Sequence, residues 1–154
     1  MMATGYEVLE GKCGRVLVVL HRNCRITKAE ILALLTEAGV DPATVTFVEP
    51  EGIAKCGDLS DATAIIPLDD AVCDEPELES VGRHCGTAGA EVVVLFGPDC
   101  NYKGLHPIAA GYGTQCDWSA ERLKGCVAGE GDAPRDPAGK LTERPAPREV
   151  KCGK

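Results

Sequence analysis

The sequence has few aromatic residues, no long apolar run and no excess of positive charge. Only 4% of its 154 residues are aromatic, and the formal net charge is −8. Nucleic-acid binding needs a basic face and often uses rings to stack bases, so the composition argues against nucleic acid as a partner. Apolar runs such as Val16 to Leu20 are far shorter than the ~20 residues of a membrane span. We therefore expect no membrane partner either.

Targeting signals and the usual cysteine motifs are also missing. The N-terminal stretch MMATGYEVLEGKCG holds no apolar core of signal-peptide length, so we expect a cytoplasmic protein. Nine cysteines are present, but no two of them form a CxxC pair. This removes the strongest sequence signals for a zinc ribbon or a thioredoxin-like site, and we expect reduced thiols.

Short apolar runs recur along the chain and predict β-strands. RVLVVLH (Arg15–His21) and AEVVVLFG (Ala90–Gly97) are typical of strands in a parallel sheet, where both faces are covered. A proline donates no hydrogen bond to a neighbouring strand, so Pro67 should lie at the end of its strand. The remaining strands are predicted in Thr44–Pro50, in Ala62–Leu68 and in residues 113–118.

Helical patterns lie between these runs. Thr27 and Glu30 fit a capping box at the start of a helix, and Gly39 fits its C-terminal stop. A second helix is expected to begin near Pro76, because proline suits the first helical turn. A third helix has Ser119 as its predicted N-cap.

The alternation of strand and helix predicts a three-layer α/β domain with right-handed crossovers. Five mostly parallel strands within residues 1–128 suit a flavodoxin-like domain with strand order 2-1-3-4-5. From residue 129 the chain is rich in proline and charge and almost lacks large apolar residues. We therefore expect residues 129–154 to form a disordered tail.

The predicted fold indicates where a ligand would bind. Open parallel sheets bind ligands beyond the carboxyl ends of their strands, at the crevice where the strand order reverses. The first strand is followed by neither GxGxxG nor a Walker pattern, which argues against a Rossmann dinucleotide site or a P-loop. The candidate ligand-binding residues are His21, Arg22, Asn23, Arg25, Asp70, Asp99 and Asn101.

Two side-chain types at this edge suggest particular ligand groups. Arg22 and Arg25 suit a phosphate, because a guanidinium offers forked hydrogen bonds and a fixed charge. Asp69 and Asp70 suit ribose hydroxyls or a divalent metal such as magnesium. A solvated loop and a solvated strand end are the structural alternatives for the two pairs.

The order of Asp69, then Glu79-x-x-Gly82, then the strand EVVVLFG resembles nucleoside deoxyribosyltransferases and the related Toll/interleukin-receptor-like NAD hydrolases. These families break an N-glycosidic bond, which builds positive charge on the sugar. The resemblance implies that Glu79 is the catalytic carboxylate that stabilises or attacks this sugar cation. It also implies that Asp69 or Asp70 holds the ribose, with Asp69 as the second residue of the catalytic site. Glu77 is the substitute for Glu79 if the alignment is shifted.

Cysteines near the predicted strand ends suggest a different chemistry. Cys24, Cys56, Cys73 and Cys100 each fall a few residues after a strand, so four loops at one edge would each present a thiol. Thiolates bind zinc, copper(I) and iron–sulfur clusters. Cysteine is also an ordinary small buried residue, and structural thiols are the alternative.

These patterns together predict a protein that binds a nucleotide or nucleoside-like small molecule at the strand ends, with N-glycosidic bond cleavage as a further activity. One alternative is a non-catalytic interaction module whose tail docks a protein partner. The other is a cysteine-ligated metal or redox protein. The sequence specifies no cofactor and no oligomeric state.

Overall fold

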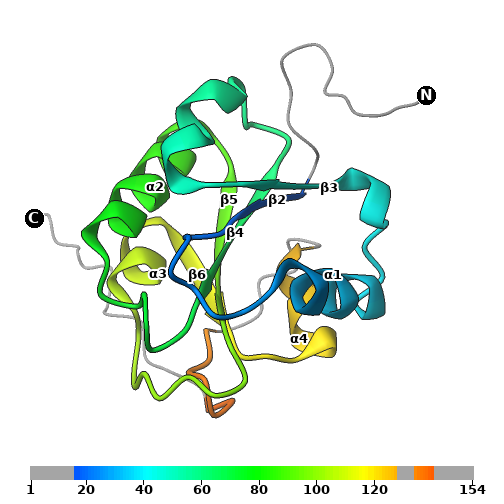
Figure 1. Ribbon diagram of the computed structural model, residues 1–154, viewed down its shortest axis with the longest axis vertical. Helices are drawn as coiled ribbons and strands as arrows, with labels where there is room; N and C mark the ends of the chain where they lie inside the picture. Colours follow the sequence, from blue (N-terminus) through cyan, green and yellow to red (C-terminus); the bar gives the residue numbers. More distant parts are fainter. Residues whose placement is uncertain (1–15, 128–133, 141–154) are drawn as a thin grey trace, which may run out of the picture.

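The computed structural model describes residues 16–127 and 134–140. Within them, five parallel strands form one sheet in the order β3-β2-β4-β5-β6 (Figure 1). In chain order this is 2-1-3-4-5, so the predicted three-layer α/β fold is confirmed. The strands are β2 (Val16–Val19), β3 (Val45–Val48), β4 (Thr63–Leu68), β5 (Glu91–Phe96) and β6 (Gly113–Cys116).

Helices cover both faces of the sheet, with α2 and α3 on one face and α1 and α4 on the other (Figure 1). Two 3-10 helices, η2 and η3, flank β3 in the chain. The helices are α1 (Lys28–Glu37), η2 (Pro42–Thr44), η3 (Pro50–Cys56), α2 (Pro76–Thr87), α3 (Pro107–Tyr112) and α4 (Ala120–Val127). None of the helices in the described residues is long and apolar enough to span a bilayer.

Local sequence signals set two helix starts as predicted. Thr27 and Glu30 form the capping box of α1: the Glu30 N–H donates to Thr27 Oγ1 at 3.1 Å, and the Thr27 N–H donates to Glu30 Oε1 at 2.9 Å. Helix α2 begins at Pro76, where the missing N–H would have no intrahelical partner in any case. Both helices therefore begin beside the carboxyl edge of the sheet.

The core has two halves, one on each face of the sheet. Alternation along β4 sends Ile66 toward α2 and α3, whereas Ile65 faces α1 and α4. The first half gathers Phe96 of β5 with Leu78 of α2, and both side chains are almost fully buried. Burying one such large apolar side chain contributes about 1.5–3 kcal/mol, so the contact between β5 and α2 stabilises this half of the core.

Pro67 lies within β4, one residue before its end. The β2–β4 pairing stops at Val18 and Ile65, whereas Pro67 is paired with Leu95 of β5. The proline therefore lies beyond the last residue pair that β4 shares with β2, where a missing N–H is tolerated. Strands β2 and β4 end their pairing at this point, on the carboxyl side.

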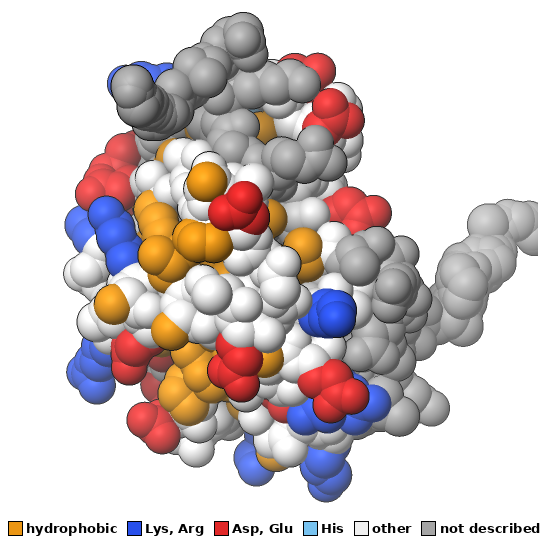
Figure 2. All heavy atoms as spheres, turned by 90° about the vertical axis from the view of Figure 1, so that its right-hand side faces the viewer, with side chains coloured by type: hydrophobic (Ala, Val, Ile, Leu, Met, Phe, Trp, Pro, Cys, Tyr) orange, Lys and Arg blue, Asp and Glu red, His pale blue; other side chains and the backbone are white. Residues whose placement is uncertain are grey.

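Figure 2 shows the side of the molecule that carries β3 and α1. Acidic and basic side chains are interspersed on it, around smaller groups of apolar side chains. The described part of this side therefore carries charges of both signs around apolar groups (Figure 2).

Part of the expected tail lies within the described residues. Residues 134–140 lie against β6, where the Arg135 N–H donates to the Gln115 carbonyl oxygen at 3.3 Å. Further backbone and side-chain hydrogen bonds lie within this segment, and the disorder expected from residue 129 stays a prediction. The rest of the predicted tail lies outside the described residues.

Candidate functional site

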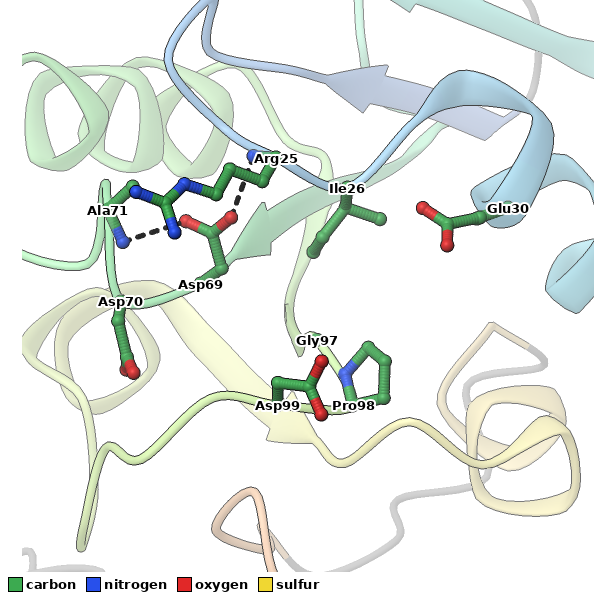
Figure 3. Close-up of a pocket in the computed structure, with 9 residues that line it drawn as sticks. All are labelled: Arg25, Ile26, Glu30, Asp69, Asp70, Ala71, Gly97, Pro98 and Asp99. Atoms are coloured by element: carbon green, nitrogen blue, oxygen red, sulfur yellow. Dashed lines mark hydrogen bonds between the residues drawn. The ribbon is translucent and has the colours of Figure 1, made fainter.

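Two cavities lie at the carboxyl edge of the sheet, on either side of the loop between β2 and α1. We call the first the acidic cavity and the second the outer cavity. The acidic cavity has a volume of about 200 Å³ and is lined by Arg25, Ile26, Glu30, Asp69, Asp70, Ala71, Gly97, Pro98 and Asp99 (Figure 3). The outer cavity has a volume of about 360 Å³ and is lined by Leu20, His21, Arg22, Cys24, Lys28, Phe47, Val48 and Glu49.

The acidic cavity lies at the switch point of the sheet. The loops after β2, β4 and β5 form it, and α1 and α2 leave the first two of these strands toward opposite faces. Loops that diverge in this way open a crevice at the strand ends. In Figure 3, Glu30 of α1 and Asp99 of the β5–α3 loop approach this space from different sides.

Asp69 joins the two loops that flank the switch point. Its Oδ2 accepts a hydrogen bond from the Arg25 N–H at 2.7 Å, and its Oδ1 accepts one from the Ala71 N–H at 3.0 Å (Figure 3). The Cys24 thiol is a further neighbour of the carboxylate. Both oxygens of Asp69 therefore hold the protein's own backbone, and its first role is to fix the rim of the cavity.

Asp70 joins the loops after β4 and β5. Its Oδ1 accepts from the Asn101 N–H and its Oδ2 accepts from Asn101 Nδ2, both at 2.8 Å. These hydrogen bonds lower the pKa of the Asp70 carboxyl, because they favour the charged form. Two of the predicted ligand-binding residues thus bind each other.

Asp99 is the carboxylate of the cavity with the most free acceptor capacity. It is exposed, and it makes no hydrogen bond or ion pair with the described part of the chain. Glu30 also lines the cavity, with Oε1 committed to the capping box. Arg25 is exposed, and Figure 3 shows its side chain extending past Asp69 toward Ala71.

The predicted residues His21, Arg22 and Asn23 do not line the acidic cavity. His21 is only 1% exposed, and its Nδ1 accepts from the Asn23 N–H at 3.0 Å. Its Nε2 lies 3.2 Å from Glu77 Oε1 but makes no hydrogen bond with the described residues. Arg22 Nη1 lies 3.6 Å from the same oxygen. His21 and Arg22 therefore face the start of α2.

The structure separates the two residues to which the resemblance gives catalytic roles. Asp69 lines the acidic cavity, whereas Glu79 is exposed on α2 and lines neither cavity. Glu77, the substitute, contacts His21 and Arg22. No carboxylate of α2 therefore lies beside Asp69 in the acidic cavity.

The four cysteines proposed as metal ligands are not brought together. Cys56 is disulfide-bonded, so it supplies no thiolate, and for this residue the expectation of a reduced thiol is wrong. Helix η3, which Cys56 ends, carries the chain from the carboxyl edge back toward the start of β4. Across residues 16–127 and 134–140, no three His, Cys, Asp or Glu side chains form a group that could hold a metal ion.

The remaining thiols at this edge are protonated at neutral pH. Burial is the largest cause that raises the pKa of Cys24 and of Cys100, each to about 11. Burial also raises the pKa of Cys73, and the nearby Asp74 adds to this. Thiols react and bind metals as thiolates, so these three behave as structural groups at neutral pH.

Five lining residues of the acidic cavity were not among the site residues predicted from the sequence: Ile26, Glu30, Ala71, Gly97 and Pro98. Glu30 carries a clear capping signal, which gave it a structural role. A Cβ on Gly97 would lie 2.8 Å from Ile26 Cδ1, so glycine lets the loop after β5 approach the loop after β2. The Gly-Pro-Asp sequence directly after a buried strand is the signal that would have found this wall.

Comparisons with models of known protein families, with curated proteins and with solved structures found no match.

Proposed function

We propose that the protein binds a small nucleoside-like molecule in the acidic cavity. The observation that carries this proposal is the position of the cavity: loops after three neighbouring parallel strands enclose it at the switch point. This is the place where open α/β sheets bind small ligands.

The charge of the cavity favours the nucleoside over the nucleotide. Asp69, Asp70, Asp99 and Glu30 supply four carboxylates against the single guanidinium of Arg25. Carboxylates accept hydrogen bonds from the hydroxyls of a ribose, whereas they repel a phosphate. The side chains of Ile26 and Pro98 add apolar contact area for the base or the sugar ring. The hydrogen-bond acceptors that line the cavity are thus matched to a neutral, hydroxyl-bearing ligand.

Cleavage of an N-glycosidic bond stays a prediction from the resemblance. It requires a carboxylate against the face of the sugar where positive charge develops. Asp99, rather than Glu79, is the cavity carboxylate that no described residue engages by a hydrogen bond or an ion pair. We therefore propose ligand binding as the function and test cleavage separately.

Calorimetric titration with adenosine, inosine and thymidine, and with their 5′-monophosphates, tests the proposal. We expect the nucleosides to bind more tightly than the monophosphates. Asp99→Asn should weaken nucleoside binding by about 10-fold or more, since a hydrogen bond to a charged group contributes ~1.5–3 kcal/mol. Glu37→Gln is the matched control, because it removes an exposed carboxylate from the other end of α1.

Two results would contradict the proposal. If none of the nucleosides binds, the proposed function is refuted. If the Asp99→Asn and Glu37→Gln variants bind nucleoside with equal affinity, the assignment of the site to the acidic cavity is refuted. Chromatography of the same mixtures measures release of free base. If no base is released from bound nucleoside, the cleavage prediction fails while the binding proposal stands.

A further inference from the structure

Residues 134–140 form a compact turn, which we call the docked turn. The Asp136 N–H donates to the Lys140 carbonyl oxygen and the Gly139 N–H donates to the Asp136 carbonyl oxygen, both at 2.8 Å. Asp136 Oδ1 accepts from the N–H groups of Ala138 and Lys140, both at 3.0 Å. Arg135 Nη1 donates to the Gly139 carbonyl oxygen at 2.9 Å. The turn is therefore held by its own hydrogen bonds.

Two sets of contacts attach the docked turn to the domain. Gln115 of β6 accepts from the Arg135 N–H through its carbonyl oxygen, and its Nε2 donates to the Arg135 carbonyl oxygen at 3.1 Å. Gly139 lies against an ion pair in which Arg122 donates to both oxygens of Asp117, at 2.6 and 2.7 Å. Gly139 has a φ of +87°, and a Cβ there would lie 3.2 Å from Arg122 Nη2 and 3.3 Å from Asp117 Oδ2.

Buried polar groups continue from this attachment to the acidic cavity. Gln115 is fully buried, and its Oε1 accepts from the His106 N–H at 2.8 Å. His106 Nδ1 accepts from the Ile108 N–H at 3.1 Å, so the neutral ring carries its proton on Nε2. That Nε2–H donates to the Cys73 carbonyl oxygen at 2.7 Å.

The last step reaches the rim of the cavity. The Cys73 N–H donates to the Asp69 carbonyl oxygen at 3.0 Å, which closes the turn that carries Asp69 and Asp70. A continuous chain of hydrogen bonds therefore joins the docked turn, through Gln115, His106 and Cys73, to Asp69, which lines the acidic cavity.

The attachment of the docked turn is incomplete in one respect. Arg135 Nε is buried and finds no hydrogen-bond acceptor among the described residues. A buried donor without a partner opposes the state that buries it. Release of the docked turn would return this group to water. The free energy that favours docking is therefore smaller than the number of contacts suggests.

We propose that the docked turn regulates the acidic cavity. When it is docked, Gln115 and His106 hold the turn from Asp69 to Cys73 in the position that shapes the cavity. When it is released, Gln115 loses one acceptor and the chain of hydrogen bonds loosens up to Cys73. This inference rests on the proposed function only in that it takes the acidic cavity to be the controlled site.

Nuclear magnetic resonance of the full chain tests the proposal. Gly139→Val places a β-branched residue at a positive φ against the ion pair and should release the docked turn. Ala138→Val, in the same turn at an exposed position, is the matched control. We expect Gly139→Val to move the backbone amide signals of Gly104, His106 and Cys73, and Ala138→Val to leave them in place.

A second variant replaces residues 134–140 by glycine and serine and removes the docked turn in any case. Changes confined to residues 113–140 in both this variant and Gly139→Val would overturn the proposal. Titration with adenosine forms a separate arm, in which release of the turn should weaken binding several-fold. If the native chain binds no nucleoside, the proposed function fails while the amide signals still decide the inference.

Discussion

Replacement of Asp69 by alanine should loosen the carboxyl edge of the sheet and lower the stability of the whole domain. The side chain holds two backbone N–H groups, and one of them belongs to Arg25, 44 residues away in the chain. A hydrogen bond to a charged acceptor contributes ~1.5–3 kcal/mol, and the loss of two is partly offset because water can reach a half-buried site. We therefore expect Asp69→Ala to cost about 2–4 kcal/mol.

Urea denaturation followed by circular dichroism measures this cost. With a slope of about 1.5 kcal/mol per molar urea for a small domain, the midpoint should fall by ~1.3–2.7 M. Asp69→Asn keeps one acceptor oxygen and should lose about half as much. Asp99→Ala removes a carboxylate of the same cavity, but this carboxylate binds no described group. Its effect on the free energy of unfolding should therefore stay within about 0.5 kcal/mol. Equal midpoints for Asp69→Ala and Asp99→Ala would refute the role given to Asp69.

Three further predictions concern packing, pH and reactivity. A Cβ at Gly113 would overlap a backbone carbonyl of β5, so Gly113→Ala should lower the free energy of unfolding by about 2–3 kcal/mol, as measured by thermal unfolding. Gly111→Ala is the control and should cost nothing, because a Cβ at Gly111 would lie in open space. The lowered pKa of Asp70 stabilises the fold above the ordinary carboxyl pKa of about 4, and this stabilisation is lost as the pH falls through the folded value. The destabilisation by Asp70→Asn, which weakens the bonds to Asn101, should therefore be present at about pH 7 and vanish near pH 2, and equal losses at both would contradict it. Since the pKa of Cys24 is about 11, iodoacetamide at neutral pH should alkylate this thiol ~100-fold more slowly than in the unfolded chain. Mass spectrometry measures the two alkylation rates, and equal rates would disprove the burial of Cys24.

The fold followed from the sequence because its signals are local. Apolar strands with two covered faces, a capping box at Thr27 and a proline at the first turn of α2 each act over a few residues. Together they determined the order of elements, and the right-handed crossover rule then gave the strand order. The same reasoning located the cavity at the carboxyl edge.

Individual roles at the site did not follow, because they depend on contacts between distant loops. Asp70 and Asn101 were both predicted as ligand-binding residues, yet a pair of hydrogen bonds joins them across 31 residues of chain. Periodicity and spacing give no information on such pairings. His21 was likewise placed at the correct strand end, but the direction of its ring depends on α2, whose position is a tertiary property.

The position of Pro67 also matters before the chain has folded. The segment ATAIIPL is apolar and rich in β-branched residues, and such segments stack between chains when they are exposed. A proline interrupts that stacking because it cannot donate the hydrogen bond that the next chain would need. In the native sheet the same residue costs little, since β2 has ended its pairing with β4 before Pro67 is reached. We therefore expect Pro67, which lies beyond the β2–β4 pairing in the folded protein, to lower the aggregation of this strand while the chain is unfolded.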